Sequence, residues 1–217
     1  MTNDDFLEID EKKKPLYLRH YTNRSSLLKI LKTMSLRLGN PEKWEDRNDF
    51  ASVAAYKRKT GAEEIRVLCF AHGLEVVHHW NTYAKKDGCC IMLKSNKIIN
   101  YLEKSGCFLH REMKYYSRED LTAKKLRVLE TEKIPFIKRH PYECEKEYRV
   151  IWTGKKSEQP PSIPIKDCIE YITLSPSFKK DDGEKLSDFL YKTYSIKTNN
   201  SRILESKDWI SLFNNLK

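Results

Sequence analysis

The sequence lacks the short motifs that identify the commonest nucleotide-binding and hydrolytic enzymes. It contains no G-x-G-x-x-G, no phosphate-binding P-loop, no G-x-S-x-G and no H-E-x-x-H. Each motif supplies a phosphate cradle, a nucleophile or a pair of zinc ligands, so their absence disfavours Rossmann dehydrogenases, P-loop NTPases, α/β hydrolases and zincins. The six cysteines form no C-x-x-C pair. We therefore expect reduced core thiols and no metal site.

Long apolar runs are also missing. Residues 1–15 are first acidic and then basic, without the apolar stretch of a signal peptide, and no window reaches membrane-spanning length. From these absences we expect a cytoplasmic protein that is neither exported nor inserted into a membrane.

The composition nevertheless predicts a folded domain. Of 217 residues, 33% are charged and the mean hydropathy is −0.71, but 11% are aromatic and short apolar stretches recur along the chain. This combination argues against disorder, and the length fits one compact domain. The Pro-rich segment 159–161 is too short to separate two domains. We expect an N-terminal arm over residues 1–15 and a single domain over residues 16–217.

Positive charge is concentrated in the first third of the chain. The formal net charge is +10, and residues 12–66 hold fourteen Lys and Arg against six Asp and Glu. A basic face of this kind favours an anionic partner, either DNA or RNA or a phosphate-rich cofactor. Lys57, Arg58 and Lys59 are the candidate nucleic-acid-binding residues, and the segment 119–140 is also basic. The alternative is a solvated surface that only keeps the protein soluble.

Strand and helix patterns alternate along the chain without an internal repeat. Apolar residues recur at helical spacing after Ser25 and Ser26, which are candidate helix caps, and short β-branched or aromatic runs predict strands. The expected strands cover residues 16–20, 35–38, 67–70, 89–93, 108–116, 146–153, 169–174 and 201–204. The expected helices begin after residue 26 and cover residues 50–60, 78–85, 97–104, 119–135 and 182–194, with a loop at 44–50. We expect an α+β fold with a mixed or antiparallel central sheet and flanking helices.

Five motifs occur in order between residues 16 and 152. They are His20-Tyr21-Thr22, Asn40-Pro41-x-x-Trp44-x-Asp46 with Asp49-Phe50, Cys69-Phe70-Ala71, Trp80-x-x-Tyr83-Ala84 before Gly88, and Glu145-x-Glu147-Tyr148-Arg149. With these motifs the chain resembles a bacterial family of domains of unknown function. That family is in turn remotely similar to ADP-ribosyltransferases, including those that act on nucleic acids and the RNA 2′-phosphotransferases, which open with an H-x-T strand and a short leucine-rich helix.

The resemblance implies an ADP-ribosyltransferase-like fold with NAD as co-substrate. It implies that His20 binds a ribose hydroxyl of NAD, and that Thr22 or neighbouring backbone, including that of Tyr21, holds the nicotinamide amide. Trp80 and Tyr83 offer flat surfaces on which nicotinamide can stack, although aromatics at helical spacing are more often core residues. Arg37 is a candidate for binding the pyrophosphate through paired hydrogen bonds, as are Arg19 and Arg47.

The chemistry of NAD cleavage calls for a carboxylate. Breaking the nicotinamide–ribose bond develops positive charge on the sugar, much as in glycoside hydrolysis. Side chains on a strand alternate with period two, so Glu143, Glu145 and Glu147 are expected on one face. Glu147 is our first candidate for the catalytic carboxylate, and Glu145 the second, either in the same role or as general base. The alternative is a ladder of exposed carboxylates paired with Lys146 or Arg149.

These patterns favour an NAD-dependent ADP-ribosyltransferase-like enzyme that modifies a nucleic acid or another macromolecule. A toxin or phage-defence effector, with a neutralising or defence-system partner protein, is a role that suits such an enzyme. The alternatives are an NAD glycohydrolase and a catalytically inert module that binds nucleic acid or protein.

Overall fold

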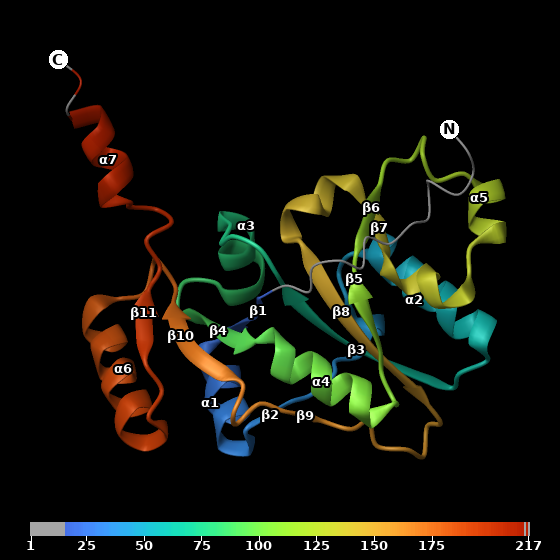
Figure 1. The fold of residues 1–217 in the computed structure, drawn as a ribbon, viewed down its shortest axis with the longest axis horizontal. Coiled ribbons are helices and arrows are strands. Elements are labelled where there is room, and N and C mark those ends of the chain that lie inside the picture. The colour runs from blue at the N-terminus through green and yellow to red at the C-terminus, as the bar shows by residue number, and fades with distance from the viewer. Residues whose placement is uncertain (1–15, 215, 217) are drawn as a thin grey trace.

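A central sheet organises the molecule. The computed structural model describes residues 16–214 and 216, apart from the side chains of 123 and 124. Within these residues the sheet has seven strands in the order β11-β10-β4-β1-β3-β8-β5 (Figure 1). Every neighbouring pair is antiparallel except β10 and β11. The strands are β1 (Tyr17–Asn23), β3 (Glu64–Ala71), β4 (Gly88–Lys94), β5 (Leu109–Glu112), β8 (Glu147–Gly154), β10 (Ile169–Leu174) and β11 (Thr198–Asn200).

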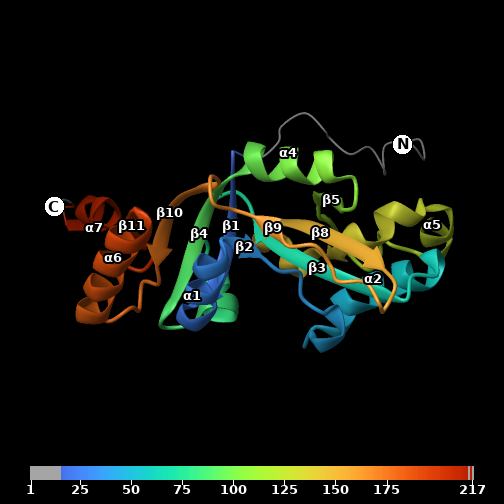
Figure 2. The same cartoon turned by 90° about the horizontal axis from the view of Figure 1, so that it is seen from below.

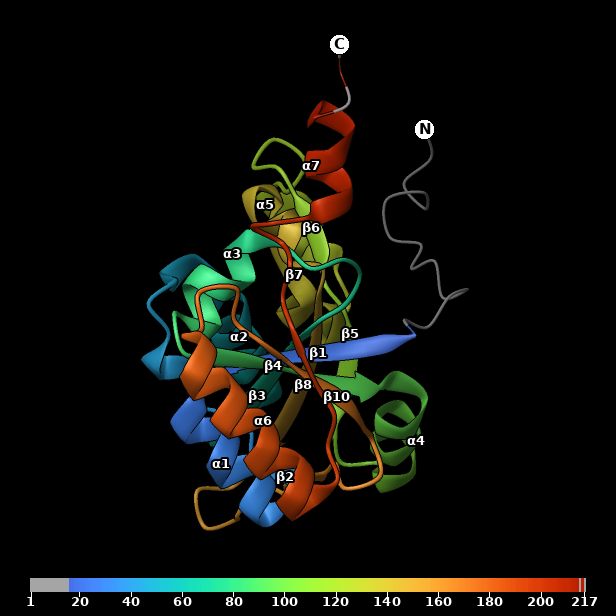
Figure 3. The same cartoon turned by 90° about the vertical axis from the view of Figure 1, so that its left-hand side faces the viewer.

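Helices cover both faces of the sheet. One face packs on α1 (Arg24–Thr33), α4 (Ser95–Ser105) and α6 (Lys180–Tyr194). Figure 3 shows these three helices below β1 and β4, with α3 (Val77–His79) above them. The other face packs on α2 (Arg47–Thr60), the 3-10 helix η3 (Thr131–Phe136) and, over β1 and β4, the π-helix η2 (Trp80–Ala84). The expected α+β fold with a mainly antiparallel central sheet is confirmed.

The remaining elements are short. Two small sheets pair β2 (Ser35–Leu36) with β9 (Ile163–Pro164), and β6 (Lys114–Tyr116) with β7 (Ile137–Arg139). Three short helices lie in the connections between other elements. They are the 3-10 helices η1 (Pro41–Lys43), between β2 and α2, and η4 (His140–Glu145), between β7 and β8, and the helix α5 (Ala123–Val128), between β6 and η3. Helix α7 (Lys207–Asn214) has no buried side chain and projects from the body at the end of the molecule opposite α2 and α5 (Figures 1 and 2). In the part of the chain that the structure describes, no helix has the length and apolar character needed to cross a membrane.

The centre of the sheet is open between β1 and β3. Strand β1 pairs with β4 along its whole length, and β3 pairs with β8 over eight positions. Between β1 and β3, in contrast, Arg19 with Ala71 is the single register pair that the described residues form. The sheet therefore consists of two well-joined halves that touch at one point and diverge beyond it.

Most expected strands and helices are present, and the differences have local causes. Helix α1 is capped by Asn23, whose side chain accepts a hydrogen bond from the Ser26 N–H, and not by Ser25 or Ser26. The expected loop 44–50 is wrong in its second half, because Asp46 caps α2 and the helix begins at Arg47. The long helix expected over 119–135 is also wrong. Leu129 and Glu130 have extended backbone and Pro135 lacks an N–H, so only α5 and η3 form.

Four further boundaries differ. The strand expected at 108–116 is interrupted at Met113 into β5 and β6, and the strand expected at 35–38 ends at Leu36. The helix expected at 78–85 is divided into α3 and η2, and the last strand lies at 198–200 instead of 201–204. The expected arm, residues 1–15, lies outside the described residues.

Candidate active site

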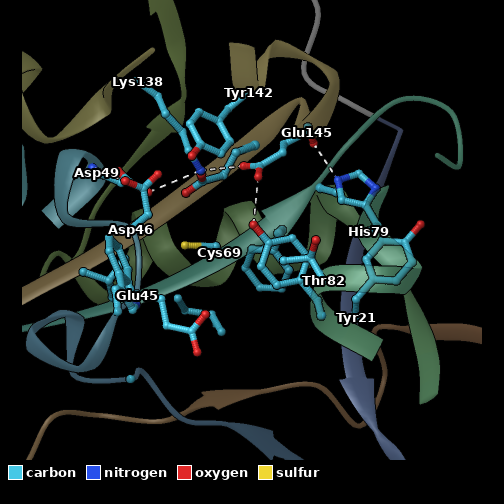
Figure 4. Close-up of a pocket in the computed structure, with 18 of the residues that line it drawn as sticks. Tyr21, Glu45, Asp46, Asp49, Cys69, His79, Thr82, Lys138, Tyr142 and Glu145 are labelled. Atoms are coloured by element: carbon cyan, nitrogen blue, oxygen red, sulfur yellow. Dashed lines mark hydrogen bonds and ion pairs between the residues drawn. The ribbon is translucent and has the colours of Figure 1, made fainter. Parts of the chain in front are cut away.

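A cavity of about 1030 Å³ lies where β1 and β3 diverge. Consecutive residues of both strands line it, although neighbouring strand side chains point to opposite faces, so the cavity reaches the strand edges themselves. Its walls come from β1 (Arg19, His20, Tyr21), the segment 37–49, β3 (Val67 to Ala71), α3 and η2 (His78, His79, Thr82, Tyr83), and the region of β7 to β8 (Lys138, Tyr142, Glu145, Glu147). In Figure 4, Asp46 and Asp49 lie across the cavity from Tyr21 and His79.

One end of the cavity holds a buried cluster of three carboxylates and two cations. Lys138 Nζ lies 2.5 Å from Glu145 Oε2, 3.1 Å from Glu147 Oε2 and 3.3 Å from Asp49 Oδ2. The Arg149 side chain is 0% exposed. Its Nε donates to Glu147 Oε1 at 2.6 Å, and its Nη2 donates to both Asp49 carboxylate oxygens at 2.8 Å. Each buried charge is therefore directly paired, which is the condition for keeping charges away from water.

The two cations determine how this cluster titrates. Burial raises the pKa of Glu147, but the charges of Arg149 and Lys138 outweigh it and lower that pKa to about 2. At Asp49 the balance is reversed, since burial raises its pKa more than Arg149 lowers it. Burial lowers the pKa of Lys138, but the surrounding carboxylates raise it further, so Lys138 stays charged. Glu147 is thus an ionised carboxylate at neutral pH.

Glu145 differs from Glu147 in facing the π-helix across the cavity. The Tyr83 hydroxyl donates to Glu145 Oε1 at 2.9 Å, and His78 Nε2 lies 3.1 Å from the same oxygen. His79 Nε2 donates to the Glu145 carbonyl at 3.1 Å (Figure 4). A single-turn π-helix such as η2 is frequent at functional sites. Its position beside β4 depends on Gly88, since a Cβ there would lie 2.0 Å from the Ala84 carbonyl oxygen.

The expectation that Glu143, Glu145 and Glu147 alternate along one strand is wrong. His140 to Glu145 forms η4, and Lys146 has a left-handed backbone (φ 42°), so β8 begins only at Glu147. Glu143 lies at the surface, where it pairs with His140 and Lys146. The left-handed residue turns the chain so that Glu145 and Glu147 still meet at Lys138.

His20 borders the same cavity as Glu147 and Tyr83, but it lies on the opposite face of the sheet from Glu147. The strand register aligns Glu147 with Ala71 and Arg19, and aligns His20 with Ile91 in the core. The His20 ring packs edge-on to Phe70 at 6.0 Å and bonds to the backbone of Cys69. Burial lowers its pKa to about 4, so the ring is neutral at pH 7. The family resemblance and the chemistry of NAD cleavage together predict that His20 and Glu147 converge on one site. That prediction is wrong for a site on one face of the sheet, because the two side chains lie on opposite faces.

The other expected NAD contacts divide into two groups. Tyr21, Tyr83 and Arg37 line the cavity, and the Tyr21 ring stacks on His79 with ring centres 4.7 Å apart. Thr22 and Trp80 do not line it. Thr22 is buried on the same strand face as His20, opposite Cys89, and Trp80 is a core residue that packs edge-on to Tyr21 and bonds to Glu75. Their expected contacts with nicotinamide are not supported by these positions.

Cations outnumber the acidic residues Glu45 and Asp46 at the rim of the cavity. Arg37, Lys43 and Arg47 are exposed and line it, together with the half-buried Arg19. Arg19 donates to the Gly73 carbonyl, and the Arg47 guanidinium lies 4.6 Å from the centre of the Phe50 ring. Guanidinium groups at a cavity rim suit a phosphate-bearing ligand.

The expected nucleic-acid residues Lys57, Arg58 and Lys59 lie outside the cavity. They form the last turn of α2, where cations interact favourably with the helix dipole, and Gly61 ends that helix with a left-handed φ of 68°. Lys57 also pairs with Glu42 at 3.3 Å. At 1.5 Å per residue they are roughly 12–15 Å from Asp49 along the helix.

Several site residues were not assigned a role from sequence. Asp46 and Asp49 belong to a quoted motif, and Arg149 was considered only as a surface partner. Lys138 carried no signal, because one lysine in a basic segment normally faces solvent. Among the described residues, no group of three or more His, Cys, Asp or Glu side chains is arranged to hold a metal ion.

Comparison of the chain with family models, curated proteins and solved structures finds no match.

Proposed function

We propose that this protein is an NAD-dependent ADP-ribosyltransferase that modifies a nucleic acid or another macromolecule, and that the cavity between β1 and β3 holds NAD. The observation that carries the proposal is the charge arrangement of one cavity, with buried carboxylates at one end and cations at its rim. Its volume of about 1030 Å³ is at the upper end of the range for ligand pockets, as a dinucleotide requires.

The proposal includes the remote family relationship and an ADP-ribosyltransferase-like fold. Two features support them. The first strand among the described residues contains His20-Tyr21-Thr22 and continues into the leucine-containing helix α1. The motif residues Asp49, Glu145, Glu147 and Arg149, which lie far apart in sequence, meet in one cluster. A cytoplasmic toxin or phage-defence effector, controlled by a partner protein, is the biological role we propose for such an enzyme.

The reaction needs a negative charge beside the ribose. The bond between C1′ and the nicotinamide nitrogen breaks, and neutral nicotinamide leaves with the bonding electrons. The acceptor nucleophile then forms a bond to C1′ and loses its proton. A carboxylate next to C1′ stabilises the positive charge that develops on the sugar between these two events.

Glu145 is better placed for this role than Glu147, which was the first candidate from sequence. Both Glu147 oxygens are engaged by Arg149 and Lys138 within the buried cluster. Both Glu145 oxygens are engaged as well, Oε2 by Lys138 and Oε1 by Tyr83 and His78. The difference is that Tyr83 and His78 line the cavity and are partly open to solvent, so Oε1 lies on the side from which a ligand enters. We assign Glu145 as the carboxylate that stabilises the sugar cation, and Glu147 as the positioning residue that holds Lys138 against it.

Two alternative functions are tested by the same experiment. An NAD glycohydrolase would use the same residues, with water as the acceptor. An inert binding module is favoured by one specific observation, namely that His20 is packed on the face of the sheet opposite Glu147.

The test is nicotinamide release from NAD by purified protein, with and without total RNA or DNA. We expect Glu145→Gln to lower the rate by about 10²-fold or more, because the charge needed in the transition state is removed. Glu143→Gln is the matched control, since Glu143 is an exposed carboxylate two residues away. It should cleave NAD at the wild-type rate.

The outcomes separate the alternatives. Cleavage that needs RNA or DNA supports transfer, and cleavage that is independent of them supports a glycohydrolase. Loss of activity in Glu147→Gln alone moves the catalytic role to Glu147. Full activity in both glutamine variants, or no cleavage by the wild-type protein, rejects the enzymatic function.

A further inference from the structure

A second cavity, of about 450 Å³, adjoins the first. The two share five lining residues, which are Asp46, Asn48, Asp49, Lys138 and Tyr142. In Figure 4, Asp46, Asp49, Lys138 and Tyr142 lie on the side of the first cavity away from Tyr21 and His79. A ligand in the second cavity would therefore meet a ligand in the first at this shared wall.

The second cavity is lined in part by small and apolar side chains. Small residues of α2, including Ala51 and Ala55, leave space on one side, and the apolar Ile134, Ile137 and Leu126 line the cavity as well. Apolar walls suit the face of a nucleobase, because removing that face from water is favourable whichever base carries it.

A buried carboxylate oxygen at the shared wall lacks a partner. Asp46 Oδ1 caps α2, accepting hydrogen bonds from the N–H groups of Asn48 at 2.8 Å and Asp49 at 3.2 Å. Asp46 Oδ2 is shut off from solvent and makes no hydrogen bond with any described residue. The Tyr142 hydroxyl interacts with the Asp46 carboxylate, which raises the pKa of Tyr142, but Asp46 Oδ2 itself has no hydrogen-bond partner among the described residues. Leaving such an acceptor unpaired is costly, and a ligand N–H would satisfy it.

The second cavity also has cations among its lining residues. Arg118 and Arg139 line it and are exposed. Guanidinium groups bind phosphate oxygens through paired hydrogen bonds, so these arginines suit the backbone on either side of a bound base.

We infer that the second cavity binds the acceptor base of a single nucleic-acid strand, and that Asp46 Oδ2 accepts a hydrogen bond from an exocyclic amino group of that base. This inference rests on the proposed function, because the first cavity must supply the ADP-ribosyl group. After the bond between C1′ and nicotinamide has broken, the amino nitrogen forms the bond to C1′, and the amino proton passes to Asp46. Cytosine, adenine and guanine carry such an amino group, whereas thymine and uracil do not.

The experiment measures the affinity of fluorescently labelled oligo(dC) and oligo(dT) by polarisation at low salt. Ala51→Trp should fill the second cavity, since Ala51 is exposed and does not line the first. We expect it to weaken oligo(dC) binding by about tenfold, the equivalent of losing one stacked base. Nicotinamide release without acceptor should stay at the wild-type rate. Lys185→Trp, on the exposed surface of α6 at the other end of the molecule, is the matched control (Figure 1).

A second variant tests the role of Asp46. Asp46→Asn retains an oxygen to cap α2 but replaces the buried acceptor with an N–H donor. Wild-type protein should prefer oligo(dC) to oligo(dT), and Asp46→Asn should reverse this order. An unchanged preference would overturn the role of Asp46.

The two proposals fail in different ways. Wild-type affinity of Ala51→Trp for oligo(dC), or no binding by the wild-type protein at low salt, overturns the inference even if NAD is cleaved. If the wild-type protein cleaves no NAD but Ala51→Trp loses oligo(dC) binding, the base site stands and the proposed function is rejected.

Discussion

At the residue scale, Glu147 links the chemistry of the cavity to the stability of the fold. It is buried against Arg149 and Lys138, which lower its pKa from 4.5 to about 2. A carboxylate whose pKa is lower in the folded state stabilises the protein at pH values above the unfolded pKa. That contribution is lost as the pH falls from about 4.5 towards 2.

The prediction concerns the difference in free energy of unfolding between the wild-type protein and Glu147→Gln. The variant should be less stable at pH 5 and above, because Arg149 loses a buried counter-ion, and the difference should shrink as the pH falls towards 2. Urea unfolding at a series of pH values measures it.

Taking the difference between the wild-type protein and Glu147→Gln cancels the effect of other groups that titrate in the same pH range. The pKa values of His20 and His79 are lowered by burial to about 4, so both destabilise the fold between pH 6.5 and 4, but they do so in both proteins. Glu143→Gln should show no such difference at any pH. A Glu147→Gln difference that is constant with pH would contradict the assigned pKa.

At the scale of elements, α6 and α7 show how differently two amphipathic helices contribute to stability. Helix α6 buries Leu186 and Leu190 against β10 and the main core. Helix α7 leaves Trp209, Ile210, Leu212 and Phe213 exposed. Helical periodicity is present in both sequences, but only α6 has a sheet face to cover.

Matched truncations in the two helices test this difference. We expect Leu190→Ala to cost about 2–5 kcal/mol, since Leu190 is fully buried and its removal leaves a cavity. Phe213→Ala should change the free energy of unfolding by no more than about 0.5 kcal/mol, because the side chain is 56% exposed. Chemical denaturation measures both. A cost for Phe213→Ala close to that of Leu190→Ala would show that α7 packs on the body in solution.

At the scale of the whole molecule, the charged residues form two sets, one buried and one exposed. One end of the first cavity holds buried paired charges, whereas exposed Arg and Lys side chains are among the lining residues of both cavities and Lys57, Arg58 and Lys59 form the last turn of α2. Long-range attraction of a nucleic acid would come from the exposed set, and the choice of base from the cavities.

The prediction at this scale is that Lys57→Glu, Arg58→Glu and Lys59→Glu together weaken binding of RNA and DNA and reduce its dependence on salt. Fewer counterions are released when fewer phosphates are neutralised. NAD cleavage without acceptor should be retained, because these residues do not line the first cavity. The measurement is affinity across a salt series.

The matched control replaces the exposed Lys179, Lys180 and Lys185 with Glu, which changes the net charge equally at the other end of the molecule. Equal weakening by both triple variants would contradict a binding surface on α2. Negligible binding by the wild-type protein at low salt would reject a nucleic-acid acceptor altogether.

The sequence by itself determined the elements whose pattern is local. Strands β1, β3, β4, β8 and β10 follow from short apolar runs, because alternate residues must bury on a sheet face. The same alternation separates Glu147 and Arg149 from Tyr148 and Val150 on β8. Helix α6 follows from its 3.6-residue period. The motifs also named Glu145, Glu147, Tyr83 and Tyr21, all of which line one cavity.

Only the tertiary structure decided how these elements form a site. The opening between β1 and β3, and the face on which His20 lies, depend on pairing between strands about fifty residues apart, which no local pattern records. The sequence around Lys138 is basic and predicts an exposed surface. Lys138 is nevertheless buried, because Asp49, Glu145 and Glu147 surround it. Glu145 reaches that lysine through one left-handed residue, Lys146. Local propensity depends on neighbours in the chain, whereas burial of charge depends on partners that the fold alone brings together.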